Sequence, residues 1–346
     1  MTSLPLALNA LLFAAAAYGV WIAGARLASY ADEISDRKRM GKALMGLVFL
    51  AAATSLPEVV TTMTAAIAGE ARLLLNNMFG GVSMQTAILA VADIFAGSAA
   101  ISFYPRKPTP ILEGSLLILL LGLLNGIVLF GEQVLIWQIG FGSICVALAY
   151  MLAIAMLRQF DEKDVWLAIE IPEEKEDAPV YPWRIRLEAM PISALVLRCA
   201  AASAMILVCG IVLVHVSDAL AEQTGLGRSF IGATLLAATT SLPEVSTTIM
   251  AVRLRAYTMA ISNIFGSNLI MIILLLPADI LYRPGPVLAE TDATAQFAIV
   301  SGIVVTVIYV IGLVIRSSRT IRGVGIDSVL VMAIYLATVA VFYSLR

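Results

Sequence analysis

Apolar runs of about 20 or more residues fill most of this 346-residue chain, and short polar stretches separate them. A helix of that length spans the ~30 Å hydrocarbon core of a bilayer. Ten such runs can be placed, at 5–29, 43–69, 73–103, 109–131, 134–157, 191–217, 229–252, 257–282, 292–315 and 324–345. The pattern predicts an all-α membrane protein with ten transmembrane helices.

The composition agrees with a chain surrounded by lipid. Apolar residues make up 60% of the sequence and charged residues 13%, against about 25% charged residues in soluble domains. A net charge of −2 gives no basic surplus, so nucleic-acid binding is not indicated. All three cysteines lie in apolar runs and predict no disulfide framework.

The positions of lysine and arginine predict an orientation. Of the 22 basic residues, 16 fall in one set of alternate loops, and such loops stay in the cytoplasm. Both termini are therefore expected outside, in a multi-pass protein of the cell (inner) membrane. The polar segment 158–190 becomes a cytoplasmic linker between a first five-helix repeat, 1–157, and a second, 191–346.

The two halves share an internal repeat. Residues 46–94 align without a gap with residues 232–280, and 20 of the 49 positions are identical, including the polar motif TSLPE. Five predicted spans separate the copies, so the second copy crosses the membrane in the opposite direction. Inverted repeats are typical of secondary transporters, whose site lies near the bilayer midplane between the copies.

The repeated motif places one glutamate deep in each copy. Glu58 and Glu244 each lie about 15 residues into a predicted span, and the middle of the spans holds no lysine or arginine. An ionised carboxylate at that depth costs at least about 2.5 kcal/mol. Each glutamate therefore needs a mobile cation or a proton.

The neighbours of the glutamates are oxygen ligands. Thr54 and Thr240 precede them by four residues and lie on the same helix face. The proline directly before each glutamate lacks an N–H, so it kinks the helix and frees a carbonyl in the preceding turn. Ca²⁺ takes six to eight such oxygens. The alternative is a proline kink whose hydroxyls bond only to the helix backbone.

Each copy also carries an asparagine and an aspartate further along. Asn77 and Asn263 precede a glycine, and each amide can either hold the neighbouring kinked helix or face the ion. Asp93 and Asp279 follow the glutamates by 35 residues. They are expected near the membrane surfaces, as interfacial or helix-end groups.

The paired segments, TSLPE followed by LNNMFGGVSMQT in one copy and by ISNIFGSNLIMI in the other, resemble the alpha repeats of the sodium/calcium exchanger family, part of the calcium:cation antiporter superfamily. The resemblance implies that Glu58, Glu244, Thr54 and Thr240 bind Ca²⁺ centrally. It also implies a set of flanking sodium ligands, formed by the side chains of Ser55, Ser241 and Ser267 and the carbonyls of Ala51 and Ala237.

The sequence departs from the family pattern around the sodium positions. Gly81 and Val82 stand where the first copy should read Ser-Asn, and Gln85 and Met271 replace the usual Asn or Asp. The resemblance therefore implies a Ca²⁺ antiporter with a reduced sodium periphery. Na⁺ is the first choice of counter-ion, with H⁺ as the alternative, and another divalent cargo stays open.

Two other functional classes are disfavoured. A passive cation channel would use rings of polar groups in symmetric subunits, which differs from two inverted repeats around one doubly acidic site. An intramembrane enzyme would need a nucleophile with a base, and no Ser–His or metal-binding histidine motif is present in the sequence. The protein is expected to be no enzyme and to need no cofactor besides the transported ions. Oligomeric state stays open.

Overall fold

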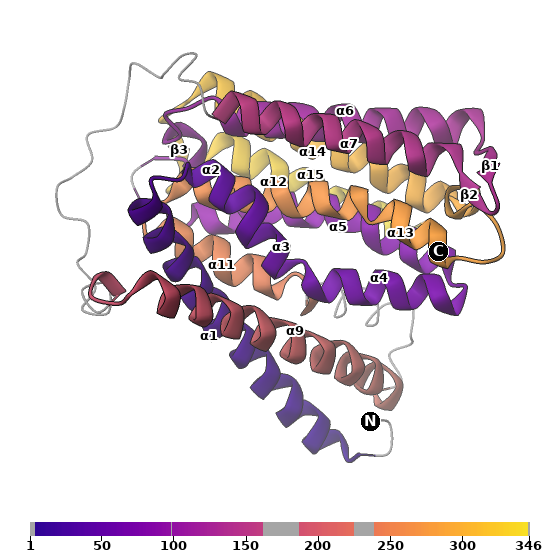
Figure 1. Ribbon diagram of the computed structural model, residues 1–346, viewed down its shortest axis with the longest axis horizontal. Helices are drawn as coiled ribbons and strands as arrows, with labels where there is room; N and C mark the ends of the chain where they lie inside the picture. The colour runs from indigo at the N-terminus through magenta and orange to yellow at the C-terminus, as the bar shows by residue number, and fades with distance from the viewer. Residues whose placement is uncertain (1–3, 98, 162–186, 225–238, 345–346) are drawn as a thin grey trace.

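The computed structural model describes residues 4–97, 99–161, 187–224 and 239–344. Most of them are helical, and the long helices α5, α6, α7, α12, α14 and α15 run roughly alongside one another, while α1 and α9 form a pair on one side (Figure 1). Seven described helices are long and apolar enough to cross a membrane, and a bent pair raises the number to eight. The chain is an integral, multi-pass membrane protein.

Helices and short turns alternate through the first half. They are α1 (Leu6–Lys38), α2 (Lys42–Leu44), the π-helical η1 (Met45–Leu50), α3 (Ala51–Thr54), α4 (Leu56–Ala68), α5 (Ala71–Asp93), the 3-10 helix η2 (Ile101–Phe103), α6 (Thr109–Phe130), strands β1 (Val134–Ile136) and β2 (Ile139–Gly140), and α7 (Phe141–Asp161).

The second half repeats this order as far as it is described. It contains α9 (Ile192–Gln223), α11 (Leu242–Arg253), α12 (Tyr257–Ile273), α13 (Leu275–Leu281), the 3-10 helix η3 (Val287–Glu290), α14 (Ala293–Ile315), strands β3 (Thr320–Ile321) and β4 (Val324–Gly325), and α15 (Ile326–Ser344). Each strand pair is an antiparallel hairpin between two long helices.

The predicted spans agree with these helices except at some ends. The span predicted at 73–103 ends as a helix at Asp93, and residues 134–140 of the span predicted at 134–157 belong to a hairpin. Both errors have one cause, because an apolar run does not distinguish a short strand or turn from a helix end. The span predicted at 229–252 lies partly outside the described residues, as does most of the predicted linker.

The two copies fold alike at the level of the backbone. Ser55 and Ser241, which are 186 positions apart, have φ, ψ of −79°, 6° and −88°, 2°. Gly69 and Arg255, at the same offset, both have the left-handed conformation, with φ of 78° and 60°. A left-handed arginine costs roughly 1–2 kcal/mol. The shared fold of the repeat therefore overrides local preference at Arg255.

Asp93 and Asp279 make matching tertiary contacts. Both side chains are fully buried, and both lie at helix ends, Asp93 as the last residue of α5 and Asp279 two residues before the end of α13, which is one of the two roles expected from the sequence. Asp93 accepts hydrogen bonds from the backbone N–H groups of Ile101 and Gly325, at 2.6 Å each. Gly325 belongs to the hairpin of the other half, so Asp93 joins the two halves.

Asp279 repeats these contacts in the opposite sense. It accepts from the backbone N–H groups of Val287, at 2.6 Å, and of Gly140, at 2.7 Å. Gly140 lies in the hairpin of the first half. Each aspartate thus fixes the hairpin that belongs to the other copy.

We expect Asp279→Ala to lower the stability of the folded protein by about 2–5 kcal/mol, because it leaves two buried N–H groups without an acceptor. The effect is measured as a fall in the unfolding temperature of the purified protein in detergent. Glu290→Gln, an exposed acidic position in η3, is the matched control and should leave the transition in place. Equal unfolding temperatures of the two variants would contradict the role of Asp279 in holding the hairpin of the other half.

Candidate ion-binding site

A break in one bent span builds the first half of the site. Helices α2 to α4 form this span, which bends by 51° at Ser55, between Thr54 and Leu56. Pro57 lies in the first turn of α4 and has no N–H to donate to the carbonyl of Ala53. The helix restarts with the hydrogen bond from Val59 N to Ser55 O, at 3.0 Å. The kink predicted from the sequence is therefore present.

The second half of the site has the same local structure. Helix α11 also carries its proline in the first turn, and Val245 N donates to Ser241 O at 3.0 Å. Thr240 and Ser241 are buried, with 4% and 3% exposed surface. Ala237, predicted to offer a sodium-binding carbonyl, lies outside the described residues.

Both glutamates are buried at the starts of helices. Glu58 is 2% exposed and Glu244 0%, and each lies in the first turn of its helix, α4 or α11. The positive end of a helix dipole favours a carboxylate there. The charges of the two side chains nevertheless repel each other directly. Within the described part of the chain, both oxygens of Glu58 and Oε2 of Glu244 have no hydrogen-bond partner.

One serine links oxygens from the two copies. Ser267 of α12 lies 3.4 Å from Glu244 Oε1 and 3.4 Å from the hydroxyl of Thr54. Hydroxyl hydrogen bonds are usually 2.5–3.0 Å long. Two oxygens that bind one Ca²⁺ at about 2.4 Å and at right angles would lie roughly 3.4 Å apart. The spacing therefore suits oxygens that share a cation better than oxygens that bond each other.

The remaining ligand candidates of the first copy adjoin this centre. The Ser55 hydroxyl is fully buried and has no partner among the described residues. The carbonyl of Ala51 accepts from Ser55 N at 2.9 Å and from the Thr54 hydroxyl at 3.3 Å. In this structure the Ala51 carbonyl thus accepts hydrogen bonds from residues of its own span.

The two asparagines differ in their surroundings. The side-chain N–H groups of Asn263 donate to the hydroxyls of Thr247, at 3.0 Å, and Thr248, at 3.2 Å. The amide N–H groups of Asn263 therefore hold α11 against α12, while its buried carbonyl oxygen has no partner among the described residues, so its second possible role stays a prediction. Asn77 is half-buried on α5.

Two of the departures from the family pattern contact each other. A Cβ atom added to Gly81 would lie 3.6 Å from the terminal methyl of Met271, and nothing else described lies within 4 Å of it. Gly81 is the counterpart of Ser267. In the first copy, the position equivalent to the Ser267 hydroxyl of the second copy thus lies beside the methyl of Met271, which comes from α12. Gln85 is 1% exposed, and its carbonyl oxygen has no partner in the described regions.

A further buried acid was not predicted from the sequence. Glu113 of α6 is fully buried, and the Ser262 hydroxyl of α12 lies 2.8 Å and 2.7 Å from its two oxygens. This contact ties α6 to α12. The signal was available in the sequence, because Glu113 falls five residues into the predicted span 109–131.

A conventional clustered metal site is not part of this arrangement. No group of three or more His, Cys, Asp or Glu side chains that could hold a metal occurs in the described residues. The centre instead combines two carboxylates with neutral hydroxyl oxygens. Such a donor set suits hard cations that are bound and released rather than a soft transition metal.

A family model and two related proteins match most of the chain. The family model described as sodium/calcium exchanger protein matches residues 8–157 and again residues 194–343. The Escherichia coli inner membrane protein YrbG is 26% identical over 294 residues, which cover 82% of each chain. The putative antiporter CaxA of Alkalimonas amylolytica is 24% identical over 267 residues, 77% of this chain and 78% of that protein.

The fold also matches a solved structure. The sodium-calcium exchanger NCX_Mj, soaked with 2.5 mM Na⁺ and 0.1 mM Sr²⁺, superposes with a TM-score of 0.73 over 97% of this chain and 99% of that one. The two sequences are 14% identical. The likeness therefore establishes a shared fold.

Proposed function

The chain belongs to the sodium/calcium exchanger family, and from that premise we propose that it is a secondary antiporter that exchanges Ca²⁺ for monovalent cations by alternating access. Na⁺ is the proposed counter-ion. H⁺ coupling is the alternative, because two buried carboxylates can also hold two protons. Members of this family are exchangers, so the chain is a transporter rather than an enzyme.

The proposed architecture is ten transmembrane helices arranged as two inverted repeats of five. Seven described helices and the bent pair are long and apolar enough to be eight of these spans, and α11 and α15 are the remaining two. Residues 1–157 and 191–346 are the repeats, with alpha motifs at 46–94 and 232–280, and 158–190 is the linker. The 186-residue offset shared by sequence and backbone supports this division.

One observation carries the proposed Ca²⁺ site. The negative charges of two buried carboxylates, Glu58 and Glu244, repel each other. Three of their four oxygens have no hydrogen-bond partner among the described residues. Burying unpaired charge costs several kcal/mol per ion. A divalent cation bound between Glu58 and Glu244, with Thr54, Thr240 and Ser267 nearby, would remove that cost.

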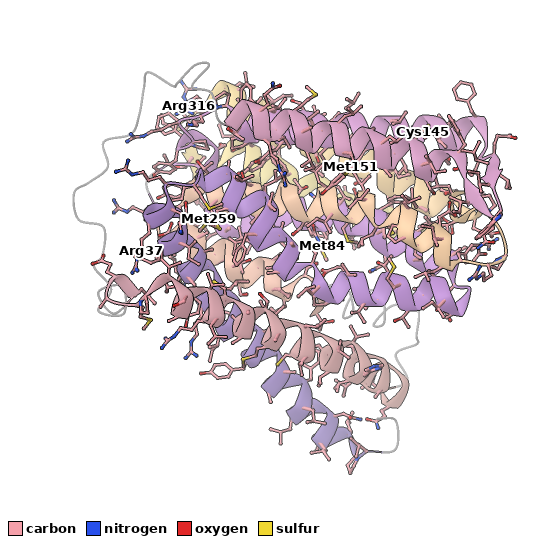
Figure 2. All side chains as sticks on the ribbon, viewed as in Figure 1. Arg37, Met84, Cys145, Met151, Met259 and Arg316 are labelled. Atoms are coloured by element: carbon pink, nitrogen blue, oxygen red, sulfur yellow. The ribbon has the colours of Figure 1, made fainter. Side chains whose placement is uncertain are left out.

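The proposed orientation places both termini outside. Arg37 and Arg316 lie at the same end of the bundle, and Met84 lies near its middle (Figure 2). Basic loops gathered at one end favour the cytoplasm. Helix α4 then ends at the outer face and α11 at the cytoplasmic face.

The function is tested by Ca²⁺ uptake into proteoliposomes that contain the purified protein. Uptake should follow an imposed outward Na⁺ gradient. Uptake driven only by an outward H⁺ gradient would favour the alternative, and uptake that needs neither ion would indicate a channel. Protein-free liposomes provide the background.

We expect Thr54→Val and Thr240→Val each to weaken Ca²⁺ binding about tenfold, or ~1.4 kcal/mol. Each change replaces a hydroxyl by a methyl at nearly equal volume. Calcium affinity is read from the concentration dependence of uptake. Thr306→Val removes a buried hydroxyl that bonds Gly302 O at 2.7 Å within α14, and serves as the control. Unchanged affinity in both site variants would mean that these hydroxyls bond only to protein.

A further inference from the structure

The two copies differ at one pair of helices although their sequences and backbones correspond. In the second copy, Asn263 of α12 donates to Thr247 and Thr248 of α11, at 3.0 and 3.2 Å. The side chains of all three residues are fully buried. These bonds hold α11 closed against α12 beside the glutamate.

The same three residue types occupy the equivalent positions of the first copy, but the contact is open. Thr61 donates to Glu58 O at 3.0 Å, as Thr247 does to Glu244 O at 3.1 Å, so this bond is common to both copies. The difference is that the buried Thr62 hydroxyl has no partner among the residues described, and that no hydrogen bond joins Asn77 to Thr61 or Thr62. The asparagine and the threonines that pair in the second copy are therefore not joined in the first.

Exposure differs in the same direction. On α12 the asparagine that bonds α11 is shut off from solvent, since Asn263 is fully buried. On α5 the equivalent Asn77 is half-buried. The paired asparagine is thus inaccessible and the unpaired one is partly accessible.

We propose that Asn77 and Asn263 are alternating latches of the transport cycle. In this structure Asn263 closes the α11–α12 side and Asn77 is released, so ions reach the site along α4 and α5. In the opposite state Asn77 donates to Thr61 and Thr62, and Asn263 no longer donates to Thr247 and Thr248. This inference rests on the proposed antiport function and, with the proposed orientation, makes the structure outward-facing.

The energetics suit a reversible switch. Each latch consists of two hydrogen bonds of ordinary length, which contribute modestly to the free energy of one state. Opening one latch while closing the other exchanges similar bonds, and both states stay close in free energy. Removing one of the two hydrogen bonds of a latch, as Thr248→Val does, should shift the population of the two states by roughly three- to tenfold.

The latch can be tested with cysteine pairs in a background carrying Cys145→Ala, Cys199→Ala and Cys209→Ala. The pairs are Asn263→Cys with Thr248→Cys, and Asn77→Cys with Thr62→Cys. A cysteine is one atom shorter than asparagine, so a bis-thiosulfonate with a one-carbon bridge is the cross-linker. Ser301→Cys with Thr338→Cys is the control, because these hydroxyls lie 2.7 Å apart between α14 and α15.

The two latch pairs should respond to ions in opposite ways. The Asn263–Thr248 pair should cross-link without Ca²⁺ or Na⁺, and the Asn77–Thr62 pair should cross-link at least threefold faster when Ca²⁺ and Na⁺ on opposite sides drive turnover. The control pair should react equally in both conditions. Equal reaction of the Asn77–Thr62 pair with and without turnover, or no reaction during active flux, would overturn the latch.

A second measurement, labelling of a single cysteine, tests the latch without the cysteine pairs and so applies even if those variants fold poorly. With Gly81→Cys as the single cysteine, Thr248→Val should lower labelling by an impermeant maleimide about three- to tenfold, and Thr62→Val should not. Equal effects of the two variants contradict the latch. Calcium flux by the cysteine-free parent reports on the proposed function separately, since a parent without flux refutes antiport while the labelling still reports on the latch.

Discussion

Glu58→Gln and Glu244→Gln should each abolish Ca²⁺ exchange, by at least about 100-fold, and leave the protein folded. One Ca²⁺ balances the formal charge of two carboxylates, and a single substitution removes half of that charge together with a hard ligand. A neutral amide is easier to bury than a carboxylate. The change should therefore favour the folded state while it removes a proposed ligand of the transported ion.

Flux in proteoliposomes and the unfolding temperature in detergent together test this expectation. Glu113→Gln is the matched control, because it neutralises another fully buried acid, and glutamine can still accept a hydrogen bond from Ser262. The control should keep most of its flux. Near-normal exchange in either Glu58→Gln or Glu244→Gln would show that Ca²⁺ binds elsewhere.

The sequence predicted the features that depend on local chemistry. Pro57 and Pro243 mark the two helix starts, and the burial of Glu58 and Glu244 follows from their depth in apolar runs. The repeat offset of 186 residues correctly paired the equivalent backbone positions of the two copies. Most of the spans could be predicted for the same reason, since lipid demands continuous apolar helices.

Features that depend on distant partners could not be predicted. Asp93 bonds an N–H group 232 positions away, at Gly325, and Glu113 bonds Ser262 across 149 positions. No local pattern specifies such a pairing. The different hydrogen bonding of Asn77 and Asn263 could not be predicted either. Both copies carry one asparagine and two threonines at these equivalent positions and differ there only in conformation.

The expected number of counter-ions is argued from charge and from the residues around the proposed centre. Two Na⁺ or two H⁺ balance two carboxylates as one Ca²⁺ does, whereas a third Na⁺ leaves the loaded site at +1. Moving that charge through a low-dielectric barrier requires further oxygen ligands. Gly81 offers no side-chain oxygen, and the space beside it faces the methyl of Met271. A thioether is a poor ligand for sodium.

We therefore expect two monovalent ions per Ca²⁺ and nearly electroneutral exchange. Restoring oxygens with Gly81→Ser and Met271→Asp should strengthen the dependence on Na⁺. The serine has room, since an added Cβ would lie 3.6 Å from the Met271 methyl, an ordinary contact distance. The added aspartate could instead carry a proton, which a comparison of flux at pH 6 and pH 8 distinguishes from Na⁺ binding, since only a proton-bearing site should lose coupling as the pH rises.

The measurement that tests this stoichiometry is Ca²⁺ flux in vesicles held at different potentials by potassium and valinomycin. With two counter-ions, flux by the unmodified protein should change little between an inside-negative and an inside-positive potential. With three, each cycle of Ca²⁺ uptake exports one net positive charge, so a positive interior would accelerate uptake. A clear acceleration of that kind would exclude two-ion exchange and would require an oxygen ligand for the third ion that Gly81 and Met271 do not supply.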